Sequence, residues 1–128
     1  MAKILVVDDD AGVVVLLKTL LELEGYQVVT TRTLQGIAPL VESEQPDLAL
    51  IDFYLGEEKG LDALAAIRRS LAAARTPVLL TSALDHRYEA EKAGADGFVL
   101  KPFTAQDLLT AIRQALARRS ERRADEVT

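Results

Sequence analysis

The sequence contains no cysteine and only one histidine, His86. Without cysteine there is no disulfide framework, no thiolate nucleophile and no zinc site with cysteine ligands. A lone histidine with no second His or Cys in the chain is a poor candidate for a metal ligand. We therefore interpret His86 as a surface residue.

Long apolar runs are also missing. The densest run, residues 13–17, is too short to cross a bilayer and is typical of part of a helix. Acidic residues begin at Asp8, and no cleavage-type segment follows a hydrophobic run, so no signal peptide is evident. These features predict a cytoplasmic protein that does not contact membranes.

Basic residues are fewer than acidic ones, which gives a formal net charge of −5. This balance argues against the domain itself binding a nucleic-acid backbone. The one basic cluster, Arg118-Arg119 and Arg122-Arg123, has acidic residues among it and is interpreted as a solvated helix end or a linker.

Apolar residues, by contrast, make up 49% of the 128 residues, enough for the core of one domain. Short β-branched or apolar runs alternate with stretches of helical spacing. Strands are predicted at 3–7, 27–31, 46–52, 77–81 and 97–100, and helices at 11–24, 34–41, 61–71, 85–93 and 104–116. Five strands alternating with five helices predict an α/β fold, a parallel sheet covered on both faces.

Carboxylates gather at one predicted edge of this sheet. Asp52 ends the third strand, and Asp8, Asp9 and Asp10 directly follow the first. Ligands bind at the carboxyl ends of parallel strands, so these residues should lie together. One Asp suffices to cap the following helix, and Asp10 can do that. Three consecutive carboxylates repel one another, and a bound cation would relieve that repulsion. The sequence therefore favours a hard-cation site involving Asp8 or Asp9, and such oxygen ligands suit Mg²⁺.

Two further polar residues end strands at the same edge. Ser82 ends the fourth strand, and the alternative interpretation is a helix N-cap, since Asp85 lies three residues later. Lys101 ends the fifth strand, although a lysine there is often only solvated. Together with the carboxylates, they would hold a metal ion and a phosphoryl group on Asp52.

Five motifs occur in order along the chain: Ile-Leu-Val-Val-Asp-Asp-Asp (4–10), Pro-Asp-Leu-Ala-Leu-Ile-Asp (46–52), Gly-Leu (60–61), Pro-Val-Leu-Leu-Thr-Ser-Ala (77–83) and Ala-Gly-Ala-Asp-Gly-Phe-Val-Leu-Lys-Pro-Phe (93–103). With these motifs the sequence resembles the CheY-like receiver domain of two-component response regulators over about residues 3–116. The resemblance implies a flavodoxin-like, doubly wound sheet of strand order 2-1-3-4-5.

The resemblance also implies roles for individual residues. Asp52 would accept a phosphoryl group from a histidine kinase or a histidine phosphotransfer protein. The domain would thus be a signalling phosphoacceptor that catalyses its own phosphorylation and dephosphorylation. The other implied roles are Mg²⁺ ligands (Asp8, Asp9, Asp52 and the Tyr54 carbonyl), a switch pair (Ser82 and Phe98), a phosphate contact (Lys101) and a cis bond before Pro102.

The sequence departs from the family pattern in three places. Gly56 stands where proline is usual, which predicts a more mobile loop. Tyr54 is bulky and would screen the phosphoryl group from water, which predicts slow self-dephosphorylation. Between Ser82 and Gly94 the chain is about one helical turn shorter than usual, so the fourth helix should be short.

The apolar residues of the predicted first helix indicate a possible protein-docking site. Its core residues should be Val13, Leu16, Leu17, Leu20 and Leu21. Val14 and Val15, and with them Leu23, would then face water. They would either be partly buried under loops or form a docking patch for the helical bundle of a kinase or phosphotransfer protein.

Two other functions and several partners remain open at this point. A Mg²⁺-dependent hydrolase of the haloacid-dehalogenase type also begins with a strand and an Asp-x-Asp motif, but Gly12 does not fit its pattern. A receiver-shaped module that never uses phosphate is disfavoured by the intact acidic set. We expect residues 1–119 to form the receiver domain and 120–128 a charged tail or the start of a linker, with an effector domain or a homodimer partner still possible.

Overall fold

The computed structural model describes the backbone of residues 1–70 and 73–127, and side chains as far as Arg119. Its centre is a five-stranded sheet of order β2-β1-β3-β6-β7 in which all neighbouring pairs are parallel. The strands are β1 (Lys3–Val7), β2 (Gln27–Thr31), β3 (Leu48–Asp52), β6 (Val78–Ser82) and β7 (Gly97–Leu100). Counted along these five strands, the order is 2-1-3-4-5, so the predicted flavodoxin-like topology is confirmed.

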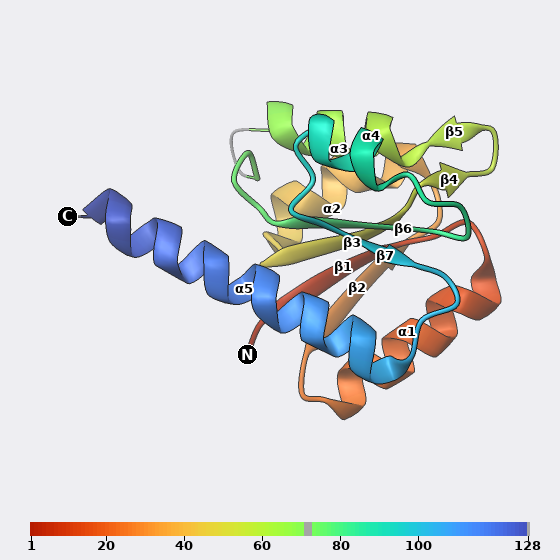
Figure 1. Cartoon of the computed structure of the whole chain (residues 1–128), viewed down its shortest axis with the longest axis horizontal. Coiled ribbons are helices and arrows are strands. Elements are labelled where there is room, and N and C mark those ends of the chain that lie inside the picture. Colours follow the sequence, from red (N-terminus) through yellow and green to blue (C-terminus); the bar gives the residue numbers. More distant parts are fainter. Residues whose placement is uncertain (71–72, 128) are drawn as a thin grey trace.

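Helices cover both faces of the sheet (Figure 1). The helices are α1 (Ala11–Leu23), α2 (Ile37–Glu44), α3 (Gly60–Arg69), α4 (Arg87–Lys92) and α5 (Ala105–Val127), with a 3₁₀ turn at Leu34–Gly36. Helices α2, α3 and α4 lie on one face, and α1 and α5 lie on the other. None of these helices is long and apolar enough to cross a bilayer, within the part of the chain that the structure describes.

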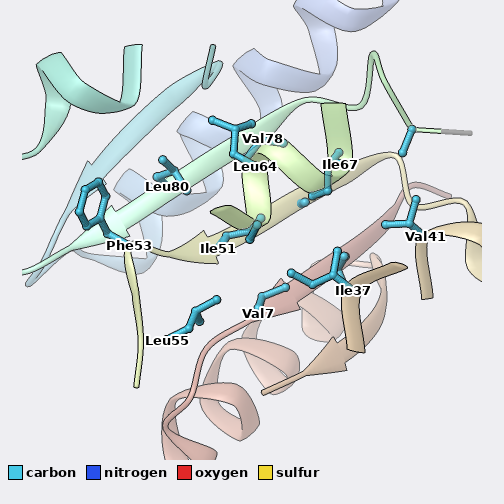
Figure 2. Close-up of a cluster of buried hydrophobic side chains, with 14 of the residues drawn as sticks. Val7, Ile37, Val41, Ile51, Phe53, Leu55, Leu64, Ile67, Val78 and Leu80 are labelled. Carbon is cyan, nitrogen blue, oxygen red and sulfur yellow. The ribbon is translucent and has the colours of Figure 1, made fainter. Parts of the chain in front are cut away.

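The strands supply both halves of the core because successive side chains point to opposite faces. In β1, Leu5 and Val7 join the cluster under α2 and α3, whereas Ile4 and Val6 join the cluster under α1 and α5. Figure 2 shows the first of these clusters, in which Ile37 from α2 and Leu64 from α3 meet the sheet. Residue 71, the predicted end of the third helix, lies outside the described residues.

Helix α1 differs from its predicted orientation. It buries Val14, Leu17 and Leu21, a stripe at spacings of three and four residues, and Val14 is only 8% exposed. The prediction that Val14 faces water is therefore wrong, and so is the core position of Leu16, which is 67% exposed. Val15 is exposed as predicted.

Two other segments differ from their predicted form. The loop after β3 contains a short antiparallel hairpin, β4 (Tyr54–Leu55) with β5 (Glu58–Lys59). Helix α5 begins with a capping box, in which Thr104 Oγ1 accepts from the Asp107 amide at 3.0 Å and the Asp107 carboxylate accepts from the Thr104 amide. The helix then continues to Val127, past the end of the apolar pattern.

The basic cluster of α5 is only partly a solvated helix end. Arg119 donates to the carboxylate of Asp47 at 2.8 Å and to its carbonyl at 3.0 Å. Arg118 donates to the carbonyl of Asp96 at 3.0 Å. These contacts fix α5 against the amino-terminal edge of the sheet, and whether residues 120–128 form a linker stays a prediction.

Candidate functional site

The sheet brings the predicted polar residues to one edge. Asp8 follows β1, Asp52 ends β3, Ser82 ends β6 and Lys101 follows β7. Because these strands are parallel, their carboxyl ends converge, and the side chains of Asp8, Asp52 and Lys101 are in direct contact. The peptide bond between Lys101 and Pro102 is cis.

Three carboxylates form the acidic part of this site. Asp8, Asp9 and Asp52 each place one oxygen within 4.8 Å of the others. Asp8 is buried, Asp52 is partly buried and Asp9 is exposed, so the cluster opens to solvent on one side. Closely spaced carboxylate oxygens with an open side suit Mg²⁺, which prefers oxygen ligands and keeps several waters.

Burial gives this cluster an electrostatic cost. Burial raises the pKa of Asp8 above its ordinary value, and the neighbouring Asp52 raises it further. The hydrogen bond from the Asp10 amide and the charge of Lys101 lower the pKa, but they do not cancel the rise. The Asp10 amide lies 3.0 Å from Asp8 Oδ1. A bound divalent cation would offset the repulsion between Asp8 and Asp52, so the donor set fits the ion in charge as well as in ligand type.

Lys101 is the cation of the site. Its Nζ lies 3.0 Å from Asp52 Oδ2 and 3.4 Å from Asp8 Oδ2. Burial lowers the pKa of Lys101, but the hydrogen bond and charge of Asp52, together with Asp8, outweigh this effect and raise the pKa overall. The ammonium therefore stays charged beside the Asp52 carboxylate.

Ser82 and Phe98 lie on the neighbouring strands β6 and β7. The Ser82 side chain is buried, and its Oγ accepts a hydrogen bond from the Leu84 amide at 3.1 Å. Phe98 is half-buried, and the guanidinium of Arg87 lies 5.8 Å from the centre of its ring. The two proposed switch residues thus stand beside the loop that leads into α4.

His86 is not the surface residue that the sequence predicts. Its side chain is only 17% exposed and stacks on the ring of Phe53, with centroids 4.0 Å apart and planes 6° apart. His86 Nε2 also lies 2.7 Å from the hydroxyl of Tyr54. Residues 53 and 54 directly follow Asp52, so His86 connects the start of α4 to the end of strand β3. No sequence motif predicts this contact.

Gly56 occupies the turn of the hairpin between β4 and β5. Its φ of +63° lies in the left-handed region that favours glycine. Its amide donates to Asp9 Oδ2 at 2.9 Å. The backbone amide of Tyr54 similarly donates to Asp52 Oδ1 at 3.0 Å. The hairpin therefore contacts two of the three carboxylates, and the predicted mobility of this loop stays a prediction.

Comparisons with known proteins agree with this geometry. A family model described as "Response regulator receiver domain" matches residues 4–113. The chain is 38% identical over 122 residues to the transcriptional regulatory protein CpxR of Escherichia coli K12, covering 92% of this chain and 50% of CpxR. It is 34% identical over 121 residues to the transcriptional regulatory protein KdpE of Mycobacterium tuberculosis, covering 92% and 52%. The chain thus spans about half the length of these curated relatives.

Solved structures give the same result. A response regulator receiver domain protein from Clostridium thermocellum superposes with a TM-score of 0.83 at 32% identity, covering 94% of this chain and 98% of that one. The structure of NtrX from Brucella abortus in complex with ATP superposes with a TM-score of 0.90 at 27% identity. The match covers 98% of this chain but 29% of NtrX.

Proposed function

The chain belongs to the response regulator receiver domains of two-component signalling systems, and from this membership we propose that Asp52 is its phosphoacceptor. One observation carries the assignment. Asp52 ends the central strand β3, where its carboxylate lies 3.0 Å from the Lys101 ammonium and beside the carboxylates of Asp8 and Asp9. Asp8 also belongs to the cluster and contacts Lys101, but it is buried and its contact is longer, at 3.4 Å, whereas Asp52 is only partly buried.

The phosphoryl donor in this proposal is a histidine kinase or a histidine phosphotransfer protein. A carboxylate oxygen of Asp52 attacks the phosphorus, the bond from phosphorus to the donor nitrogen breaks, and an acyl phosphate forms. Mg²⁺ held by Asp8, Asp9, Asp52 and the Tyr54 carbonyl would reduce the repulsion between the two anions. Lys101 neutralises charge on the phosphoryl oxygens, so the domain itself supplies the groups that promote its phosphorylation and dephosphorylation.

Phosphorylation would act on the Ser82 and Phe98 pair. The Ser82 hydroxyl turns from the Leu84 amide to an oxygen of the acyl phosphate, and the loop after β6 follows it. Phe98 then turns into the space that the loop leaves. Two discrete packings of this kind suit a switch that changes a protein-interaction surface.

The output of this switch lies with a partner. The relatives named as transcriptional regulators are about twice as long as the matched region, so an effector domain could follow a receiver of this kind. With a net charge of −5, this domain is unsuited to bind nucleic acid itself, and we place any such binding in a separate domain or partner. A homodimer partner is compatible with the same scheme, and a cytoplasmic location follows from a histidine-kinase donor.

Incubation with acetyl phosphate tests the proposed chemistry. Intact-protein mass should show one added phosphoryl group in the presence of Mg²⁺ and none with a chelator, and the adduct should be lost in base. The absence of any adduct, together with no release of inorganic phosphate, would contradict the proposal and favour a phosphate-independent module. Continuous phosphate release without an adduct would instead favour a hydrolase.

Tyr54 should set how long the phosphoryl group survives. Its phenol is held by His86 at the edge of the site, where it limits the approach of water to Asp52. We expect Tyr54→Ala to shorten the phosphoryl half-life by roughly three- to tenfold, up to about 1.4 kcal/mol of barrier. The half-life is measured by loss of the mass adduct. Tyr88→Ala, an exposed tyrosine on α4, is the matched control and should not change it.

The exposed apolar side chains of α1 are proposed to dock the phosphoryl donor. Val15, Leu16 and Leu23 are 65%, 67% and 81% exposed, whereas Val14 belongs to the core. Val15→Lys should slow phosphorylation by a histidine kinase about tenfold, a loss of roughly 1.4 kcal/mol of association free energy. Phosphorylation by acetyl phosphate needs no docking and should be unchanged. Equal rates from the kinase for both proteins would rule out docking through Val15.

A further inference from the structure

Arg32 donates two hydrogen bonds to the backbone at the acidic edge of the sheet. It follows the last residue of β2, and its Nε and Nη2 donate to the carbonyl oxygen of Asp9 at 3.2 and 3.0 Å. The acceptor is a main-chain atom, so this contact is not an ion pair with the Asp9 carboxylate. None of the motifs that identify the family includes Arg32.

Asp9 is the member of the carboxylate cluster that most needs such support. Asp8 is buried and contacts Lys101, and Asp52 lies within a strand and also contacts Lys101. Asp9, in contrast, is exposed and lies past the last contact between β1 and β2, the Asp8 amide with the Thr31 carbonyl at 3.4 Å. An exposed loop carboxylate loses conformational entropy when it is fixed in one position.

Two contacts hold Asp9, one at its main chain and one at its side chain. The Arg32 guanidinium holds its main chain, and the Gly56 amide holds its carboxylate at 2.9 Å. A planar guanidinium with two parallel donors restricts the carbonyl more than a single donor can. Together they keep the side chain directed toward Asp8 and Asp52, within the 4.8 Å of the cluster.

We propose that Arg32 is a positioning residue for the Mg²⁺ site, acting through the main chain of Asp9. This inference rests on the proposed function, because it assumes that the cluster binds Mg²⁺. Arg32 would touch neither the ion nor the phosphoryl group. It lowers the free energy needed to bring the third carboxylate into place.

The direction in which Mg²⁺ affinity changes when Arg32 is removed distinguishes a positioning role from a purely electrostatic one. Arg32 carries a positive charge next to a cation site, so its removal should tighten Mg²⁺ binding if charge alone matters. If Arg32 positions Asp9, its removal should weaken binding in spite of the lost repulsion. Residues that orient metal ligands typically change metal affinity by about 10- to 100-fold.

The test is a titration of the unphosphorylated protein with Mg²⁺ alone, followed by NMR shifts of the Gly56 and Asp10 amides. We expect Arg32→Ala to raise the Kd for Mg²⁺ about tenfold. Arg32→Lys, which keeps the charge but loses the fork, should give an intermediate Kd. Arg113→Ala is the matched control, because it removes an arginine of α5 whose guanidinium contacts Thr110 on its own helix.

The outcomes are distinguishable. An unchanged or lower Kd in Arg32→Ala would overturn the positioning role while leaving the Mg²⁺ site intact. No Mg²⁺ binding by the wild type would overturn both the site and the role of Arg32. Because Arg32 is exposed, its variants should keep the wild-type amide spectrum away from Asp9, and a shift confined to the hairpin and residues 8–10 would support the proposal.

Discussion

Asp52→Asn is expected to take up no phosphoryl group from acetyl phosphate under conditions in which the wild type takes up one. The amide oxygen of asparagine is a weak nucleophile and carries no charge to pair with Lys101, which lies 3.0 Å from the Asp52 carboxylate. Asp8, Asp9 and Lys101 remain in place, so the variant removes the proposed acceptor and leaves the surrounding charges. The loss should therefore be complete. Intact-protein mass measures it directly.

A matched control shows whether the loss is specific. Asp62→Asn makes the same chemical change at an exposed carboxylate in the first turn of α3 and should leave uptake at the wild-type level. Full uptake by Asp52→Asn would show that another residue accepts the phosphoryl group. Loss in both variants would point to an indirect effect on the fold.

Gly60→Ala should strongly destabilise the protein and displace Asp52. A Cβ at residue 60 would overlap the Asp52 carbonyl oxygen and lie 2.9 Å from Phe53 Cα, and both are backbone atoms. The Gly60 amide also donates to the Phe53 carbonyl at 2.7 Å, so α3 cannot move away without losing this bond. Such overpacking typically costs about 1–3 kcal/mol. Because the atoms that the Cβ would meet are backbone atoms of residues 52 and 53, we expect a cost at or above the upper end.

Chemical denaturation compares Gly60→Ala with the same change elsewhere. Gly12→Ala places a methyl group on α1, where its nearest contact is a side-chain oxygen of Asp10 at 3.2 Å. Since alanine favours helices over glycine by roughly 0.5–1 kcal/mol, this control should stay within about 1 kcal/mol of the wild type. Wild-type stability and phosphoryl uptake in Gly60→Ala would show that the close approach of α3 to β3 is not required.

The fold could be predicted because buried parallel strands are short apolar runs with clear ends. The run from Leu48 to Ile51 is buried along its whole length, and Asp52 marks the point where the chain leaves the core. The polar residues of the site stand at such strand ends, so the convergence of parallel strands brings them together. The sequence pattern that marks the strand ends and the parallel order of the strands therefore predict the same location for the site.

Helix α1 could not be oriented correctly for a physical reason. Residues 13–17 are all apolar, so several phases of a 3.6-residue period fit the sequence equally well. Packing against the sheet selects the phase that buries Val14, Leu17 and Leu21. Similarly, the apolar pattern of α5 stops while good helix formers such as Ala and Arg continue, and the backbone stays helical.

The contacts of His86 and Arg32 depend on tertiary geometry alone. His86 meets Phe53 and Tyr54 across more than 30 residues of sequence, and Arg32 meets a backbone carbonyl that any residue would provide. Neither contact uses a spacing or a residue pair that a motif could encode. Residues that support a site from neighbouring loops are therefore the part of the site that sequence patterns leave out.

The most direct measurement is the position of the phosphoryl group. The wild type is phosphorylated with acetyl phosphate and Mg²⁺ and then reduced with borohydride, which converts an aspartyl phosphate to homoserine. Peptide mass spectrometry then locates the change. We expect homoserine at residue 52 and unmodified aspartate at residues 8 and 9. Homoserine at another aspartate, or a stable phosphate ester on Ser82, would contradict it.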